Sequence, residues 1–231
     1  MKRLRVLSSK LQTGMLMVML ALLAATLPGC YKDKTTSKDF DGDGTAGANV
    51  KTGVKPEPDA QVAVIETADY GRIVIELYPN IAPKMVEQFK QLINGKQYDG
   101  TAIHRINPQS GIIQGGDPLS KGGNPAMWGT GNSNQPNVPA EFSDIPYERG
   151  TVGAARTNDI NTANCQWFIT LKKQPAFDRK YTVFGRVIEG INNAEVIMTA
   201  PTDPADPRHE RPADKVVIKT VTLQPRAGFA K

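Results

Sequence analysis

The chain has 231 residues, a formal net charge of +5 and two cysteines. Residues 1–30 contain four basic and no acidic side chains, so the rest of the chain carries a charge of only +1. A nucleic-acid-binding domain needs a clustered basic face in its folded part, and this near-neutral remainder does not favour one. Cys165 is the one cysteine beyond residue 30, which excludes an intramolecular disulfide in that part.

The N-terminal segment has the order of features found in an export signal. Lys2, Arg3, Arg5 and Lys10 precede an uncharged apolar run over residues 14–27. This run is shorter than the roughly 20 residues of a membrane-spanning helix. It ends in Leu27-Pro28-Gly29-Cys30, which resembles a bacterial lipobox, where a signal is cut before a cysteine that receives diacylglycerol.

We therefore expect residues 1–30 to be a lipoprotein signal peptide that is cleaved before Cys30. Lipidation of Cys30 would anchor the chain to a membrane of the cell envelope on its extracytoplasmic side, which is the periplasmic face if the cell has two membranes. A plain secretory signal or an uncleaved anchor, with Cys30 incidental, is the alternative.

Residues 31–60 are rich in lysine, aspartate, threonine, glycine and proline and lack periodicity, which predicts a flexible tether. Such a tether spans roughly 30 Å as a coil and about 100 Å when stretched. Asp39, Asp41 and Asp43 have the spacing of the first ligands of a calcium loop, but Val50 stands where a bidentate acid would complete it. An acidic linker is the favoured interpretation, and calcium binding is left open.

Residues 61–225 are long enough for one domain with a sizeable core, followed by a C-terminal tail at 226–231. Apolar and β-branched runs predict strands at residues 62–67, 72–78, 102–106, 111–114, 151–155, 166–171, 182–187 and 216–223. A helix should begin at Pro83 and stop at Asn94-Gly95, and a shorter one should cover residues 193–198. Residues 120–139 and 200–214 read as loops. About eight short strands without a helix between each pair favour a mostly β, closed barrel.

One stretch combines polar heads with an apolar surface. Arg105 and Gln114 are each flanked by isoleucines, which favours a binding site over a core. Several motifs occur in order around them: His104-Arg105-Ile, Gln114-Gly-Gly-Asp-Pro, Gly153-Ala-Ala-Arg, Gln166-Trp-Phe-Ile and Tyr181-Thr-Val-Phe-Gly-Arg-Val. This set resembles the cyclophilins, a family of peptidyl-prolyl cis/trans isomerases. The resemblance implies an eight-stranded antiparallel β-barrel capped by two α-helices.

The resemblance also implies a function and a set of site residues. Arg105 and Gln114 correspond to the catalytic positions of the family. The substrate-binding positions are His104, Ile112, Ala155, Arg156, Gln166, Phe168, Phe177 and Tyr181. The implied activity is acceleration of X-Pro isomerisation during folding of exported proteins, by a monomer that needs no cofactor or metal. Its partners would be proline-containing unfolded or exposed segments, with the lipid anchor as its contact with the membrane and no nucleic acid.

The chain also departs from the family pattern near Arg105. Most members have one residue fewer between the arginine and the glutamine, and a phenylalanine where this chain has Gly111. Arg156 stands where many members have asparagine. These departures support an alternative hypothesis, in which the domain is a catalytically weak proline-peptide binding module of the cell envelope.

Overall fold

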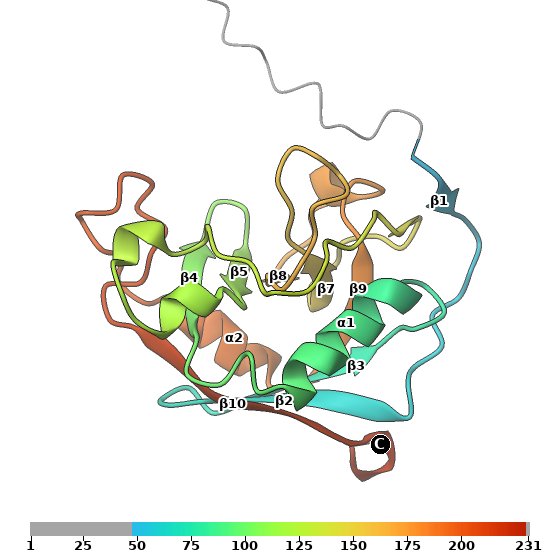
Figure 1. Cartoon of the computed structure of the whole chain (residues 1–231), viewed down its shortest axis with the longest axis horizontal. Coiled ribbons are helices and arrows are strands. Elements are labelled where there is room, and N and C mark those ends of the chain that lie inside the picture. Colours follow the sequence, from blue (N-terminus) through green and yellow to red (C-terminus); the bar gives the residue numbers. More distant parts are fainter. Residues whose placement is uncertain (1–47, 230–231) are drawn as a thin grey trace, which may run out of the picture. The chain divides into compact units, whose positions relative to one another are not determined.

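The computed structural model describes residues 48–229, in which a closed barrel forms the centre (Figure 1). Its strands follow the order β10-β2-β3-β9-β7-β8-β5-β4, and β4 pairs with β10 to close the circle. Each neighbouring pair is antiparallel. The bounds are β2 (Gln61–Thr67), β3 (Arg72–Leu77), β4 (Ala102–Asn107), β5 (Ile112–Gly115), β7 (Thr151–Ala154), β8 (Trp167–Thr170), β9 (Val183–Glu189) and β10 (Val216–Pro225). The predicted mostly β fold, with eight antiparallel strands and two helices, is confirmed.

The two helices were predicted at nearly the positions where they occur. α1 (Pro83–Asn94) begins with proline, whose missing N–H would have no partner within the helix at that position. The first backbone N–H groups of α1 find an acceptor outside the helix. The carboxylate of Glu141 accepts hydrogen bonds from Lys84 N (3.1 Å) and Met85 N (3.0 Å). α2 (Ile191–Met198) follows Gly190, whose φ of +79° suits glycine. Both helices bury apolar side chains in the main core.

Residues 48–60, which the sequence analysis placed in a flexible tether, make specific contacts with the barrel and α1. β1 (Val50–Lys51) pairs in parallel with β6 (Phe142–Ser143), and Lys51 Nζ donates to the carbonyl of Ile81 at 2.7 Å. Asp59 forms an ion pair with Lys90 of α1 at 2.9 Å. All these partners are distant in sequence, which is why local periodicity gave no signal. The predicted signal peptide, Cys30 and the Asp39-Asp41-Asp43 motif lie outside the described residues.

The C-terminal residues also pack on the barrel. β10 is followed by a short 3₁₀ turn, η4 (Arg226–Gly228), and Arg226 forms an ion pair with Glu76 at 3.2 Å. Phe229 packs on a small cluster formed by Val62, Val64 and Val74. The sequence analysis had separated a tail at residue 226, whereas the packed part continues at least to Phe229.

Two buried polar side chains hold the long loop between β5 and β6. The carboxylate of Asp117, which is fully buried, accepts hydrogen bonds from the amides of Leu119, Gly129 and Gly131. The amide side chain of Asn164 accepts from Ser133 N at 2.9 Å and donates to Gln135 O at 2.9 Å. The loop contains two 3₁₀ turns, η1 (Pro118–Lys121) and η2 (Pro125–Met127). It therefore has a defined path despite its lack of sequence periodicity.

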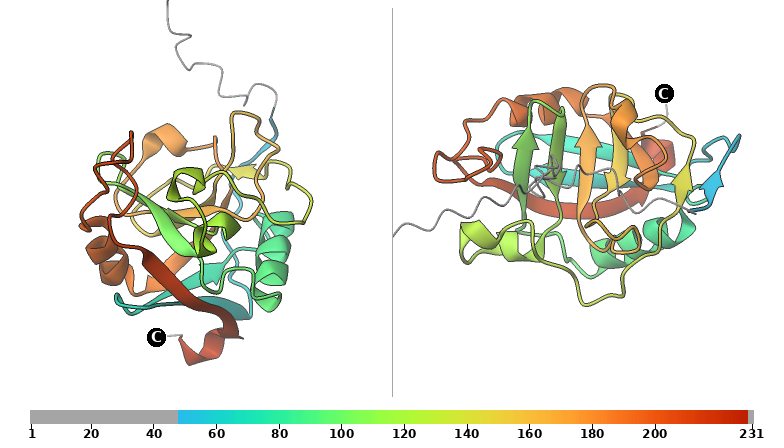
Figure 2. Two further views of the ribbon diagram at one scale, coloured as in Figure 1. Left: turned by 60° about the vertical axis from the view of Figure 1, so that its left-hand side comes forward. Right: turned by 90° about the horizontal axis from the view of Figure 1, so that it is seen from above.

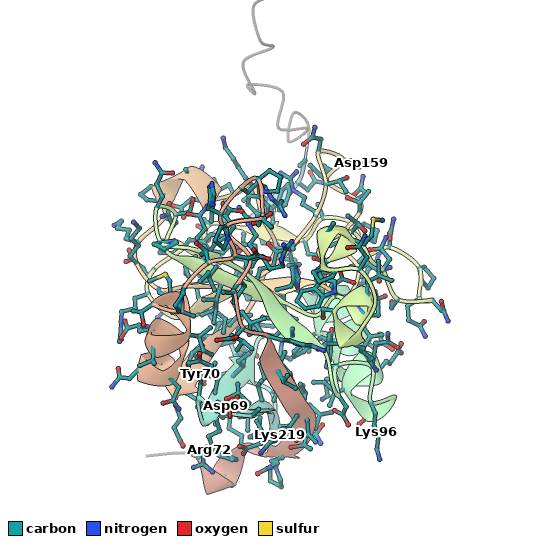
Figure 3. All side chains as sticks on the ribbon, turned by 90° about the vertical axis from the view of Figure 1, so that its left-hand side faces the viewer. Asp69, Tyr70, Arg72, Lys96, Asp159 and Lys219 are labelled. Carbon is teal, nitrogen blue, oxygen red and sulfur yellow. The ribbon has the colours of Figure 1, made fainter. Side chains whose placement is uncertain are left out.

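Four neighbouring strands form one wall of the barrel, and the loops at its two ends lie far apart. The row of β4, β5, β8 and β7 forms one wall, which is seen from above in the right panel of Figure 2. Figure 3 shows Asp69 and Tyr70 of the β2–β3 turn, with Arg72 at the start of β3, at the end opposite to Asp159, which lies in the loop after β7. Within residues 48–229 there is no helix with both the length and the apolar character needed to cross a membrane.

Candidate active site

The register of four strands sets the predicted polar and aromatic residues in one row. Arg105 of β4 is the cross-strand partner of Gln114 in β5, and Gln114 is the partner of Phe168 in β8. Phe168 in turn pairs with Gly153 of β7. Neighbouring positions such as Ile113 and Ile169 belong to the main core inside the barrel. Because side chains alternate between the two faces of a strand, the row lies on the outer face of this wall.

A directed chain of hydrogen bonds runs through the polar half of the row. Arg105 Nη1 donates to Gln114 Oε1 at 3.1 Å, and Gln114 Nε2 donates to Gln166 Oε1 at 2.9 Å. Gln166 Nε2 donates to the carbonyls of Gly129 (3.1 Å) and Gly131 (2.8 Å). The side-chain oxygen of each glutamine accepts a hydrogen bond, from Arg105 to Gln114 and from Gln114 to Gln166. The side-chain nitrogen of each glutamine is therefore the donor to the next group in this network. The orientation of both glutamines is therefore fixed by the guanidinium at one end and two carbonyls at the other.

Aromatic and aliphatic side chains form the apolar half of the site. A cavity of about 240 Å³ is lined by Arg105, Gln114, Ile112, Phe168, Phe177 and Tyr181, together with His104, Gly129, Ala155, Arg156 and Arg208. The ring of Phe168 packs edge-on against Phe177 and Tyr181 at centroid distances of 5.6 and 5.5 Å. On its other side it stacks on Tyr147 at 5.6 Å. The structure thus brings every predicted catalytic and substrate-binding residue except Gln166 to this one cavity.

Gln166 instead lines an adjoining cavity of about 340 Å³, which shares Gln114, Gly129, Ala155 and Arg156 with the first. Arg156 lies over the ring of Tyr181, with its guanidinium carbon 4.6 Å from the ring centroid. Its Nη2 donates to the carbonyl of Lys180 at 2.8 Å. These contacts hold the arginine at the boundary between the two cavities, where the family more often has asparagine.

The inserted turn between β4 and β5 is fastened to a neighbouring loop. Lys172 Nζ donates to the carbonyl of Gln109 at 2.7 Å, and Gln174 Nε2 donates to that of Ser110. Gly111 has a φ of +62°, and a Cβ atom there would lie 2.5 Å from Cγ of Lys172. A phenylalanine at this position would strain the left-handed backbone and would have to displace the side chain of Lys172. The apolar wall is therefore made by the next residue, Ile112, and by the aromatic rings opposite.

His104 lies beneath the cavity rather than in the open, with 4% of its surface exposed. Burial lowers the pKa of His104 to about 4, because an imidazolium is poorly solvated there, while the nearby carboxylate of Asp117 opposes this effect. Within residues 48–229, neither ring nitrogen has a hydrogen-bond partner. The imidazole is therefore neutral at physiological pH, and its ring packs beneath the cavity.

This burial predicts a dependence of stability on pH. Between the ordinary pKa of 6.5 and the folded value of about 4, the unfolded chain binds more protons at this histidine than the folded one. The free energy of unfolding should therefore fall as the pH is lowered through this range, by at most about 3 kcal/mol from His104. Chemical denaturation of wild type and His104→Gln at pH 7 and pH 4 measures the effect as a difference between the two proteins.

His209 provides the matched control, since it is exposed and is the other histidine of the chain. The His209→Gln variant should keep the pH dependence of the wild type. An equal loss of stability between pH 7 and pH 4 in wild type and His104→Gln would show that His104 is not responsible.

Three residues around the site were not predicted as functional. Glu210 forms an ion pair with Arg105, Arg208 lines the cavity, and Tyr147 supports Phe168 from behind. From the sequence, Arg208 and Glu210 were placed only in the loop at residues 200–214. No spacing rule connects residue 210 with residue 105, so the tertiary structure was needed to find this contact.

Cys165 lies next to Gln166 in the chain but belongs to the main core and lines neither cavity. Cys165 is fully buried, and burial raises the pKa of its thiol to about 11, which does not suit a nucleophile. Among residues 48–229, no three histidine, cysteine, aspartate or glutamate side chains are grouped so that they could hold a metal ion.

The chain is similar to known proteins of one family. Residues 62–223 match the family model described as "Cyclophilin type peptidyl-prolyl cis-trans isomerase/CLD". A probable peptidyl-prolyl cis-trans isomerase of Brucella suis is 40% identical over 152 residues, which cover 64% of this chain and 76% of the relative. Peptidyl-prolyl cis-trans isomerase-like 3 of Gallus gallus is 37% identical over 165 residues, covering 70% of this chain and 96% of the relative.

A solved structure shows the same fold. The cyclophilin type isomerase of Cryptosporidium parvum, crystallised in the presence of the dipeptide Ala-Pro, matches with a TM-score of 0.62 and 27% identity, covering 71% of this chain and 98% of that one. The family match covers most of the chain and includes Arg105, Gln114, Gln166 and Phe168. The chain belongs to the cyclophilin-type peptidyl-prolyl cis-trans isomerases and is an enzyme of that class.

Proposed function

We propose that this chain accelerates cis/trans isomerisation of X-Pro bonds during folding of exported proteins, as a monomer anchored through a lipid on Cys30. The observation that carries the catalytic part is a guanidinium held in the wall of a cavity of about 240 Å³, beside aromatic and aliphatic side chains. An X-Pro segment would place its proline ring against Ile112, Phe168 and Phe177, with the imide nitrogen facing Arg105. Proline-containing unfolded or exposed segments are therefore the expected substrates.

The reaction needs a donor rather than a nucleophile. Rotation about a peptide bond has a barrier of about 18 to 20 kcal/mol, because the C–N bond has partial double-bond character. At the twisted transition state the lone pair of the proline nitrogen is no longer delocalised and can accept a hydrogen bond. A guanidinium N–H of Arg105 directed at this nitrogen would stabilise the transition state more than either planar state, which is the condition for catalysis.

One hydrogen bond is not sufficient for the rate that is needed. Uncatalysed X-Pro exchange takes tens to hundreds of seconds, so a millisecond cycle requires a gain of about 10⁴, or roughly 5 to 6 kcal/mol. A charge-assisted hydrogen bond contributes about 1.5 to 3 kcal/mol. The remainder must come from holding the substrate: the apolar walls grip the ring, while the glutamine chain and Ala155 line the path of the preceding residues.

The activity of the domain can be tested by measuring the rate of cis/trans exchange in a proline tetrapeptide, with a protease-coupled assay or by NMR. The wild type should accelerate exchange, and titration should show binding of the same peptide. Binding without acceleration would instead support the second candidate, a proline-peptide binding module of the cell envelope. Gly111 is the observation that favours this candidate, because it replaces an aromatic residue of the family and leaves Ile112 to form that wall.

The anchoring part of the proposal rests on the Leu27-Pro28-Gly29-Cys30 ending of the apolar run. Expression of the full chain in a bacterium should give a product that is cut before Cys30, heavier by a diacylglycerol and found in the membrane fraction. Cys30→Ser should abolish both the added mass and the membrane association. Cys165→Ser should keep both, since Cys165 is buried in the folded domain. An unmodified wild-type Cys30 would rule out this anchor.

A further inference from the structure

The guanidinium of Arg105 is held on one side by a carboxylate from a distant loop. Arg105 Nε donates to Glu210 Oε2 at 2.6 Å, and Nη2 donates to Glu210 Oε1 at 3.2 Å. This is a two-point contact in which the planar fork of the arginine matches the carboxylate. The side chains of Arg105 and Glu210 are 28% and 14% exposed, so the pair is largely shielded from water. Glu210 does not itself line the cavity.

Glu210 is in turn fixed by its own surroundings. Its backbone carbonyl accepts from Ile106 N at 2.6 Å, which attaches residue 210 to the edge of β4. Its backbone amide donates to the buried carboxylate of Asp206 at 2.8 Å, and its Oε1 also accepts from the side chain of Asn107. The loop is tied further by the ion pair between Arg211 and Asp203 at 2.6 Å. The carboxylate is therefore held at a defined position before any substrate arrives.

The remaining donors of Arg105 have a restricted direction. A guanidinium has five N–H groups, and the contacts to Glu210 and Gln114 use three of them. The two that are left belong to Nη1 and Nη2, on the side away from Glu210. Since Arg105 also lines the cavity, these are the N–H groups available to a substrate there. Without Glu210, only the bond to Gln114 would restrain this long and flexible side chain.

We propose that Glu210 is a positioning residue for the isomerase reaction, which acts by presenting the Nη groups of Arg105 to the substrate. The inference rests on the proposed function of Arg105 as the donor to the proline nitrogen. The paired carboxylate also offsets the positive charge of the donor, an effect that by itself would lower kcat. The two effects predict opposite changes of kcat when the carboxylate is removed, so that kinetics distinguish them.

The expected result for Glu210→Ala is a loss of about 10- to 100-fold in kcat, with KM changed by less than about twofold, because the misplaced donor acts mainly in the transition state. Glu210→Gln keeps an acceptor oxygen and should recover part of this loss. Glu189→Ala is the matched control, since Glu189 pairs with an exposed arginine, Arg72, on the other side of the barrel at 2.6 Å. It should keep the kcat of the wild type.

A double-mutant cycle tests whether Glu210 acts through Arg105. The variant that combines Arg105→Ala and Glu210→Ala should have the same kcat as Arg105→Ala alone, within about twofold, since the positioned group is already absent. The proton NMR signal of Arg105 Nε–H should exchange slowly in the wild type, faster in Glu210→Gln and fastest in Glu210→Ala, which has no acceptor at this position. This readout needs no turnover.

Different outcomes would contradict the proposed function of the chain and the positioning role of Glu210. An inactive wild type whose Arg105 signal is still protected by Glu210 would refute the proposed function but not the restraint on the arginine. An active wild type whose kcat is unchanged or increased in both Glu210 variants would overturn the positioning role. Additive losses in the double mutant would overturn it as well. Should Glu210→Ala not fold, Glu210→Gln, which has nearly the same shape, decides the question.

Discussion

Replacing Arg105 with alanine should lower kcat/KM for an X-Pro peptide by about 100-fold, while peptide binding is largely kept. The substitution removes the guanidinium that is held between Glu210 and Gln114 at the wall of the cavity. A charge-assisted hydrogen bond of about 1.5 to 3 kcal/mol corresponds to a factor of roughly 10 to 150 in rate. The residual activity would come from the grip of the cavity on the ring. The protease-coupled exchange assay and a peptide titration measure the two quantities separately.

Two further variants serve as controls for the Arg105→Ala experiment. Arg149→Ala removes an exposed arginine that pairs with Glu195 outside the site, and it should have wild-type activity. Arg105→Lys keeps the charge but cannot form the two-point contact with Glu210, so its activity should lie between wild type and Arg105→Ala. Thermal unfolding of each variant shows whether the fold is kept. A decrease of less than about threefold in Arg105→Ala, with the fold intact, would contradict the assigned role.

Replacing Gly153 with alanine should lower the free energy of unfolding by about 1 to 3 kcal/mol and should also impair the proline pocket. Gly153 is the strand partner of Phe168, and an added Cβ would lie 2.4 Å from the hydroxyl of Tyr147 and 2.5 Å from Cζ of Phe168. Neither ring can move without disturbing the other, because they stack on each other at 5.6 Å. The displaced Phe168 ring should raise the KM for proline peptides more than it lowers kcat.

Gly122→Ala is the matched control for this substitution. No heavy atom lies within 4 Å of the position that its Cβ would take, and its φ of −169° is accessible to any residue. Urea unfolding and Michaelis kinetics on both variants and on the wild type provide the comparison. If Gly153→Ala had wild-type stability and KM, the close packing beneath Phe168 would not be what shapes the pocket.

Much of the barrel could be predicted because its strands carry their own pattern. β2, β3 and β10 are rich in β-branched residues, and α1 has a proline at its start and a glycine after its end. The short strands around the site were found within one or two residues for the same reason. The β1–β6 pair was missed, because each strand has only two residues and the partners are about 90 positions apart.

Some residues of the candidate site could likewise be predicted from local motifs, whereas others could not. Arg105, Gln114, Gln166 and Phe168 were named from their motifs, since a charged or amide side chain among isoleucines and aromatic residues is a local signal. Their pairing across β4, β5 and β8 followed from the register of the barrel. Glu210 carried no local signal at all, because its importance depends on a contact with a residue 105 positions away.

The sequence by itself determined the barrel class, the first helix and the family, and it predicted Arg105 as the donor, because each of these depends on periodicity or on residues close together in the chain. Only the tertiary structure decided which carboxylate pairs with Arg105, which rings line the cavity and that residues 48–60 pack on the barrel. These features arise from contacts between distant segments: the 200–214 loop on β4, Tyr147 behind Phe168, and residues 48–60 against the barrel. Such contacts form when the chain buries its apolar surface, and no local pattern encodes which distant residue will be the partner.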